Sequence, residues 1–121
     1  MRRQTGMLGE KIACDFLGKN GYEIIANNYR CPDGEMDIIA RERDTLVFIE
    51  VRTKRSRVFG SPEESITPLK KEKLRAVAEH YLQSLNSLPV SWRIDLVAVE
   101  MDWKNKVTRI EIIENAIEDA D

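Results

Sequence analysis

The chain has 121 residues, of which 42% are hydrophobic and 33% are charged, a balance typical of one compact domain. No apolar run approaches the roughly 18 residues that a membrane-spanning helix needs. The first residues, MRRQTGMLGEK, lack the apolar core of a signal peptide. We therefore expect a soluble cytoplasmic protein, and the composition excludes an integral membrane protein or a secreted disulfide scaffold.

The charges are unevenly distributed along the chain. The formal net charge is −2, yet residues 52–75 hold eight basic and three acidic side chains, for a local charge of +5. The remaining residues carry −7. Such a division is compatible with a phosphate-binding face on an acidic protein. A solvated loop and helix face would explain the same counts.

Hydrophobic periodicity and turn residues define the elements of the first half. The expected elements are a helix over 5–19, strands over 22–29, 35–41 and 46–53, a turn at CPDG (31–34) and a turn at Arg43-Asp44. Gly18 and Gly21 supply the end of the helix. The second and third strands are therefore predicted to form a hairpin.

The second half begins with a segment rich in Gly, Pro, Ser and basic residues. The expected elements are a loop over 54–65, a helix with Thr67 as N-cap and Pro68 in its first position, strands over 92–99 and 107–113, and an acidic, frayed tail over 114–121. The order is helix, three strands, helix, two strands. It predicts one α/β domain over 1–113, with a central mixed sheet flanked by helices.

Two acidic residues fall inside the predicted hairpin. With Arg43 and Asp44 as its loop, facing residues have numbers that add to 87, so Asp37 lies opposite Glu50. Like charges at that separation, about 4.5–5.5 Å between β-carbons, destabilise a strand pair. A divalent cation such as Mg²⁺ would offset this cost. A protonated carboxyl, a one-residue register shift, or neutralisation by a basic neighbour would also do so; the candidates are Arg41, Arg52 and Lys54.

Two helical residues could join this pair. Glu10 lies at the margin of the apolar stripe of the first helix, where its carboxylate either reaches over the sheet or stays solvated. Lys70 continues the buried stripe of the second helix, with Lys71 on the other flank. Both lysines either snorkel outward or meet a phosphate at the helix start.

Several motifs together carry a family resemblance. They are GE at Gly9-Glu10, GEMD at Gly34 to Asp37, FIEVRTK at Phe48 to Lys54, SITPLK at Ser65 to Lys70, A-x-x-Y-L at Ala78 to Leu82 and RIDLVAV at Arg93 to Val99. From Gly6 to about Ile113 the chain resembles the YraN-like uncharacterised protein family. That family is similar to the archaeal Holliday junction resolvases within the restriction-endonuclease-like, or PD-(D/E)xK, nucleases.

The resemblance implies a restriction-endonuclease-like fold and a catalytic set. Glu10, Asp37 and Glu50 would be the catalytic ligands of Mg²⁺ or Mn²⁺, and Arg52 stands where the nuclease pattern has a lysine. Arginine is effectively never deprotonated, so this departure affects any role as a base. The literal Pro-Asp pair ends at Asp33, which we reject because Asp33-Gly34 belongs to a turn.

The implied function is a metal-dependent nuclease that hydrolyses phosphodiester bonds of structured or branched DNA. The residues expected to contact the DNA backbone are Lys54, Arg55, Arg57, Lys70 and Lys71. A homodimer is compatible, because resolvase relatives are commonly dimers. The alternatives are a noncatalytic nucleic-acid-binding module, with Arg52 marking lost chemistry, and a protein-interaction domain.

Three further residues are given structural roles. Asp95 of RIDLVAV is expected to form a salt bridge with a basic neighbour rather than to act in catalysis. Trp92 and Trp103 flank the last predicted hairpin and are expected to pack in the core or at an edge rather than to stack on bases.

Overall fold

The computed structural model describes residues 2–55 and 60–117. Its elements are α1 (Arg2–Lys19), β1 (Glu23–Cys31), β2 (Gly34–Glu42), β3 (Thr45–Lys54), the 3₁₀ helix η1 (Pro62–Ser65), α2 (Pro68–Gln83), β4 (Ser91–Met101) and β5 (Val107–Ile113). The order of helices and strands is the predicted one. No described helix is long and apolar enough to span a bilayer.

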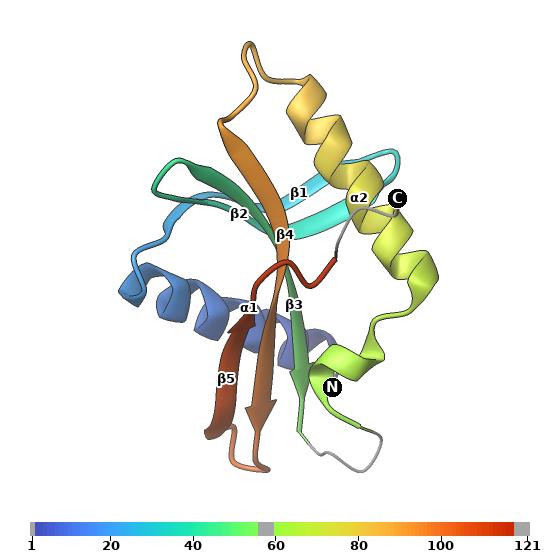
Figure 1. Ribbon diagram of the computed structural model, residues 1–121. Helices are drawn as coiled ribbons and strands as arrows, with labels where there is room; N and C mark the ends of the chain where they lie inside the picture. Colours follow the sequence, from blue (N-terminus) through green and yellow to red (C-terminus); the bar gives the residue numbers. More distant parts are fainter. Residues whose placement is uncertain (1, 56–59, 118–121) are drawn as a thin grey trace.

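The five strands form one mixed sheet in the order β1-β2-β3-β4-β5. Strands β3 and β4 are parallel, and the other neighbouring pairs are antiparallel. The connection between the parallel strands runs through η1 and α2. Figure 1 shows α1 and α2 on opposite faces of the sheet. The predicted single α/β domain, a mixed sheet between helices, is confirmed.

Apolar side chains point alternately to the two faces of the central strands and form two hydrophobic cores. Ile38 and Ile49 pack with α1 on one face, whereas Ile39 and Phe48 pack with α2 on the other. Both faces are covered, which explains why β3 and β4 are continuous apolar runs rather than alternating ones. A charged residue in the middle of β3 is therefore placed in a buried layer.

The start of α2 is fixed by its own sequence. The Thr67 hydroxyl accepts a hydrogen bond from the backbone amide of Lys70 (3.1 Å), and Pro68 occupies the first helical position. The predicted cap is confirmed. Because the cap fixes the backbone of the first turn, it also sets the direction in which the Lys70 side chain projects from the helix.

The segment expected to be a loop over 54–65 is more regular than predicted. Lys54 is the last residue of β3, and η1 forms a short 3₁₀ helix. The Glu64 carboxylate accepts hydrogen bonds from the amide and the hydroxyl of Ser61, at 2.7 and 2.8 Å. Arg109 of β5 pairs with Glu63 at 2.7 Å. Four residues are too few to show a periodic pattern, which is why the sequence predicted a loop.

The chain remains packed beyond the predicted domain end at residue 113. The backbone amide of Asn115 donates to Asp95 at 3.0 Å, and Ile117 is buried in the core beside α2. The first part of the acidic tail is thus ordered against the sheet, in contrast to the frayed end expected there. Residues 118–121 lie outside the described residues.

Candidate functional site

The β2–β3 hairpin has the predicted register, with Ile38 facing Ile49 and Glu42 facing Thr45. The strand pairs stop at Ile38, so Asp37, the preceding residue of β2, lies just beyond the paired segment. There the Asp37 carboxylate accepts a hydrogen bond of 2.8 Å from the backbone amide of Val51. The side chain thus takes the place of a backbone acceptor where β2 leaves β3.

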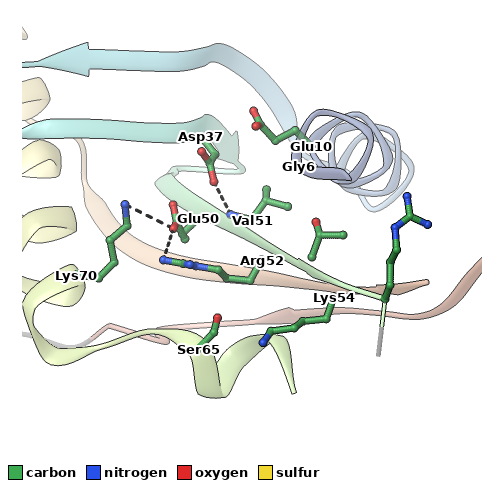
Figure 2. Close-up of a pocket in the computed structure, with 11 residues that line it drawn as sticks. Gly6, Glu10, Asp37, Glu50, Val51, Arg52, Lys54, Ser65 and Lys70 are labelled. Carbon is green, nitrogen blue, oxygen red and sulfur yellow. Dashed lines mark hydrogen bonds and ion pairs between the residues drawn. The ribbon is translucent and has the colours of Figure 1, made fainter. Parts of the chain in front are cut away.

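Asp37 and Glu50 converge at this point of divergence. Figure 2 shows the two carboxylates side by side, one from β2 and one from β3, facing the same open space. That space is a cleft of about 780 Å³ lined by Gly6, Glu10, Asp37, Glu50, Val51, Arg52, Thr53, Lys54, Arg55, Ser65 and Lys70. The predicted juxtaposition of the two acidic residues is therefore present, and Glu10 lines the same cleft from α1.

Glu50 is the most deeply placed acid of the cleft, with a relative exposure of 5%. Its Oε2 lies 3.0 Å from Nη2 of Arg52 and 3.8 Å from Nζ of Lys70. Neutralisation by Arg52, one of the predicted alternatives, is thus present in part. Arg41 instead pairs with Glu23, at 3.7 Å, on the outer strands.

The basic neighbours do not fully compensate the charge of Glu50. Burial, followed by the charge of Asp37 and a hydrogen bond with its side chain, raises the pKa of Glu50 to about 8, against the opposing effects of Lys70 and Arg52. The folded protein therefore favours a proton on this carboxyl at neutral pH. A cation between the two acids would supply the missing positive charge.

Glu10 belongs to the same electrostatic environment. Burial raises its pKa first, followed by the charges of Asp37 and Glu35. Within the described residues, however, no three His, Cys, Asp or Glu side chains form a group that could hold one ion. Mg²⁺ usually uses one or two protein carboxylates and completes its shell with waters and substrate phosphates. Asp37 and Glu50 fit that donor set, with Glu10 at the rim.

Arg52, in the position of the expected lysine, points into the ion-pair network rather than to solvent. Its Nη2 contacts Glu50, and its Nε is buried with no hydrogen-bond partner among the described residues. A buried donor without a partner carries a desolvation penalty, and such groups are few in native proteins. The guanidinium is thus only partly satisfied.

The predicted DNA-contacting residues divide into three groups. Lys54, Arg55 and Lys70 line the cleft, as expected. Lys71 instead lines a separate hollow with Glu63, so it does not belong to the cleft, and its contact with DNA stays a prediction. Consecutive helical residues differ by about 100° around the axis, so both lysines cannot face the cleft. Arg57 lies outside the described residues.

The sequence predicted the role of Lys70 only in part. It was expected to meet a phosphate, and the structure adds its contact with Glu50. Ser65, at the end of η1, also lines the cleft and was not singled out. Both belong to the SITPLK motif, which was the available signal.

Asp95 is structural, as expected. Its two carboxylate oxygens each lie 3.0 Å from Nε of Arg93, and one also accepts the amide hydrogen of Asn115. Arg93 in turn contacts Glu42 and the Tyr22 hydroxyl. This network ties β2, β4 and the C-terminal segment together away from the cleft.

The two tryptophans differ. Trp92 packs edge-on against Phe48, with ring centroids 5.9 Å apart, as predicted. Trp103 is 85% exposed, so the prediction that it packs is wrong. The polar turn around Lys104-Asn105 holds it outside the sheet, and its position immediately before that turn was the signal that could have indicated exposure.

Comparison with known proteins identifies the family. A model of the Uncharacterised protein family UPF0102 matches residues 9–99. This chain belongs to that family. The UPF0102 protein of Caldicellulosiruptor saccharolyticus is 47% identical over 115 residues, covering 95% of this chain and 98% of that protein. The UPF0102 protein of Moorella thermoacetica is 44% identical, covering 95% and 96%.

A third UPF0102 protein, from Dehalococcoides mccartyi, is 46% identical over 116 residues, covering 96% of this chain and 94% of that protein. The YraN-like resemblance is thus confirmed, and residues 9–99 include every residue that lines the cleft except Gly6. These three names state no activity, so the function of this UPF0102 protein is argued from the site.

Proposed function

We propose that this UPF0102 protein is a metal-dependent nuclease that hydrolyses phosphodiester bonds in structured or branched DNA. The observation that carries the proposal is the convergence of Asp37 and Glu50 in a cleft that is also lined by Lys54, Arg55 and Lys70. Two acids that face each other without a full complement of positive charge suit a divalent cation. The neighbouring cations suit a phosphate.

Asp37 and Glu50 would hold Mg²⁺ or Mn²⁺. The ion, when bound, polarises the phosphodiester and lowers the pKa of an attacking water. Asp37 is oriented for this role because its Oδ2 is held by the Val51 amide at 2.8 Å.

Lys70 and Arg52 would divide the work of the lysine that the nuclease pattern expects. Lys70 reaches Glu50 from α2 and carries an ammonium that can exchange a proton, whereas a guanidinium effectively cannot. We therefore assign proton transfer and phosphate contact to Lys70. Arg52 holds Glu50 in position and neutralises charge that develops on the phosphate.

Glu10 would act from the opposite wall. It lines the cleft from α1, and its pKa is raised by burial and by Asp37. In that position it would accept a hydrogen bond from a water that approaches the phosphate, or complete the ligand set once substrate is bound.

Lys54 and Arg55 extend the cleft along β3 and would contact the sugar-phosphate backbone. Backbone contacts carry no sequence information and weaken steeply with salt. We therefore expect selection by DNA shape. Resolution of a junction requires two symmetric cuts, so we also expect a homodimer, which light scattering of the protein with and without junction DNA would test.

The direct test is cleavage of four-way junction, flapped, single-stranded and duplex DNA with Mg²⁺, with Mn²⁺ and without metal. Wild type should cut at least one structured DNA only when metal is present, and Asp37→Asn and Glu50→Gln should be inactive. Asp33→Asn is the matched control, because Asp33 lies in the exposed turn after β1. Equal activity of wild type and Glu50→Gln would contradict the proposal.

A noncatalytic DNA-binding module is the second candidate, because Glu50 is already paired with Arg52 and Lys70. In that case wild type would bind junction DNA, would show no heat with Mn²⁺ and would cut nothing. Cleavage by Arg52→Lys, with none by wild type, would also favour this candidate. Mn²⁺ binding that Asp37→Asn abolishes would favour the nuclease.

A further inference from the structure

Trp103 is a large apolar ring presented to solvent by a rigid turn. It is 85% exposed at the β4–β5 turn. The Asp102 carboxylate accepts hydrogen bonds from the amides of Lys104 and Lys106, at 2.8 and 2.9 Å. Asn105 takes the left-handed conformation that closes the turn, with φ of 64°. The backbone that carries the ring is therefore held in place, and the exposure is built into the turn.

This turn lies beside the mouth of the cleft. Strands β3 and β4 are parallel and in register, with Lys54 facing Glu100, so both end at the same edge of the sheet (Figure 1). Arg55, which lines the cleft, donates from Nη1 to the carbonyl oxygen of Asp102 at 3.3 Å. Trp103 follows directly in the chain. The residue that carries the ring thus follows, in the chain, the one that Arg55 contacts at the basic end of the cleft.

The charges around the ring suit a polyanion. Lys104 and Lys106 are exposed on the same turn. Their backbone amides both donate to the Asp102 carboxylate. Lys54 at the end of β3 and Arg55 directly after it add positive charge. An aromatic ring within a basic surface is how proteins bind single-stranded nucleic acid, because each base has a face that can stack.

The separation from the acidic pair fits a strand that passes through the cleft. Lys54 is four residue steps along β3 from Glu50, a span of about 13 Å at strand rise. That length corresponds to about four stacked nucleotides at 3.4 Å each. A base stacked on Trp103 would therefore belong to the strand whose phosphate lies near Glu50, a few nucleotides away. Bases inside a continuous duplex cannot reach such a ring.

We propose that Trp103 is a stacking platform for an unpaired nucleotide of the DNA strand in the cleft. The inference rests on the proposed function and deepens it, because it defines the substrate class as DNA with a single-stranded segment beside the scissile phosphate. Fully paired linear DNA would lack the base that the ring binds.

The test compares binding of a single-stranded-tailed duplex and a blunt duplex, both labelled with fluorescein, in EDTA so that cleavage cannot occur. Trp103→Ala should weaken binding of the tailed duplex by at least about 5-fold, the lower end of what loss of one stacked base causes. Trp103→Phe should restore most of the affinity, and binding of the blunt duplex should not change. Val90→Ala is the matched control. Val90 is 89% exposed and directly precedes the first residue of β4, at the end of the strand far from Trp103.

Tryptophan fluorescence supplies a second readout, because the chain has two tryptophans and Trp92 is packed against Phe48. The tailed duplex should quench wild-type fluorescence and leave Trp103→Phe unquenched. Equal affinity of wild type and Trp103→Ala for the tailed duplex would overturn the stacking role even if the protein cuts DNA. Trp103-dependent binding without cleavage under any metal would refute the nuclease and keep the platform. Failure of wild type to bind any DNA would contradict both.

Discussion

The carboxylate of Asp37 accepts a hydrogen bond from the backbone amide of Val51 at 2.8 Å, at the point where β2 leaves β3. The Asp37 side chain thereby accepts the hydrogen bond of a β3 amide that β2 no longer pairs with, and it places an acid beside Glu50. The candidate site is therefore a consequence of how the hairpin opens.

Substitutions at Asp37 should separate these two roles. Asp37→Asn keeps an oxygen acceptor for the Val51 amide, whereas Asp37→Ala leaves that amide without its partner. We expect Asp37→Ala to be less stable than Asp37→Asn by about 1–3 kcal/mol, the penalty of an unsatisfied buried donor. Both variants should lose Mn²⁺ binding. Urea unfolding measures the difference, and equal stability of the two variants would show that the hydrogen bond does not hold the strand.

The adjacent lysines of α2 provide a matched pair. Lys70 lies 3.8 Å from Glu50, whereas Lys71 lines a different hollow. Lys70→Met should reduce cleavage by about 10²-fold or more, the usual scale for loss of a proton-transfer group. Because the charge of Lys70 lowers the pKa of Glu50, the variant should also need a higher pH for half-maximal Mn²⁺ binding. Lys71→Met should behave like wild type in both assays, and an equal loss in both variants would argue against this assignment.

The packing of α1 on β3 requires a glycine at position 9. A β-carbon at Gly9 would lie 1.9 Å from the Thr53 hydroxyl oxygen, whereas one at Gly6 would meet nothing within 4 Å. Gly9→Ala should therefore displace α1 and cost about 1–3 kcal/mol. Gly6→Ala should instead stabilise the helix by about 0.5–1 kcal/mol. Thermal unfolding tests both changes, and Gly9→Ala combined with Thr53→Ala should recover part of the loss.

Asp95 should matter for stability and not for metal binding. Its carboxylate is fully buried and bonded to Arg93 and to the Asn115 amide. Asp95→Ala should lower the free energy of unfolding by about 3–5 kcal/mol, the usual loss when one partner of a buried ion pair is removed. Asp95→Asn, which retains acceptors, should lose less and bind Mn²⁺ like wild type. Glu79→Ala on the exposed side of α2 is the control, and weaker Mn²⁺ binding by a folded Asp95→Asn would refute a purely structural role.

Much of this arrangement could be predicted because it depends on local rules. The two-residue loop at Arg43-Asp44 sets the hairpin register, and the register brings Asp37 to Glu50. Alternation then places Glu50 on the face of Phe48, toward α2. None of these steps requires contacts between distant segments.

The parts that the sequence could not predict depend on distant contacts. The 3₁₀ helix before α2 is held by Arg109, which is 46 residues beyond Glu63 in the chain. Lys71 fails as a cleft residue because of the rotation of α2 against the sheet, which caps and periodicity fix only approximately. The exposure of Trp103 is a different case, because it follows from the local turn closed by Asp102, which the sequence could have indicated.

The proposed nuclease site requires Asp37 and Glu50 to share one divalent cation. In the folded protein the pKa of Glu50 is raised from 4.5 to about 8, so without metal its carboxyl keeps its proton through neutral pH. The apo fold should lose stability as pH rises through this window, since the unfolded chain has already released that proton. Bound metal must displace it.

Calorimetric titration of Mn²⁺ in two buffers of different ionisation enthalpy counts the protons released on binding. We expect saturable binding at pH 7 with about one proton released per ion, falling toward none as pH rises well above 8. Exposed carboxylates would release almost none, because they are already ionised at pH 7. Binding without proton release, or equal heats for wild type and Asp37→Asn, would contradict the claim.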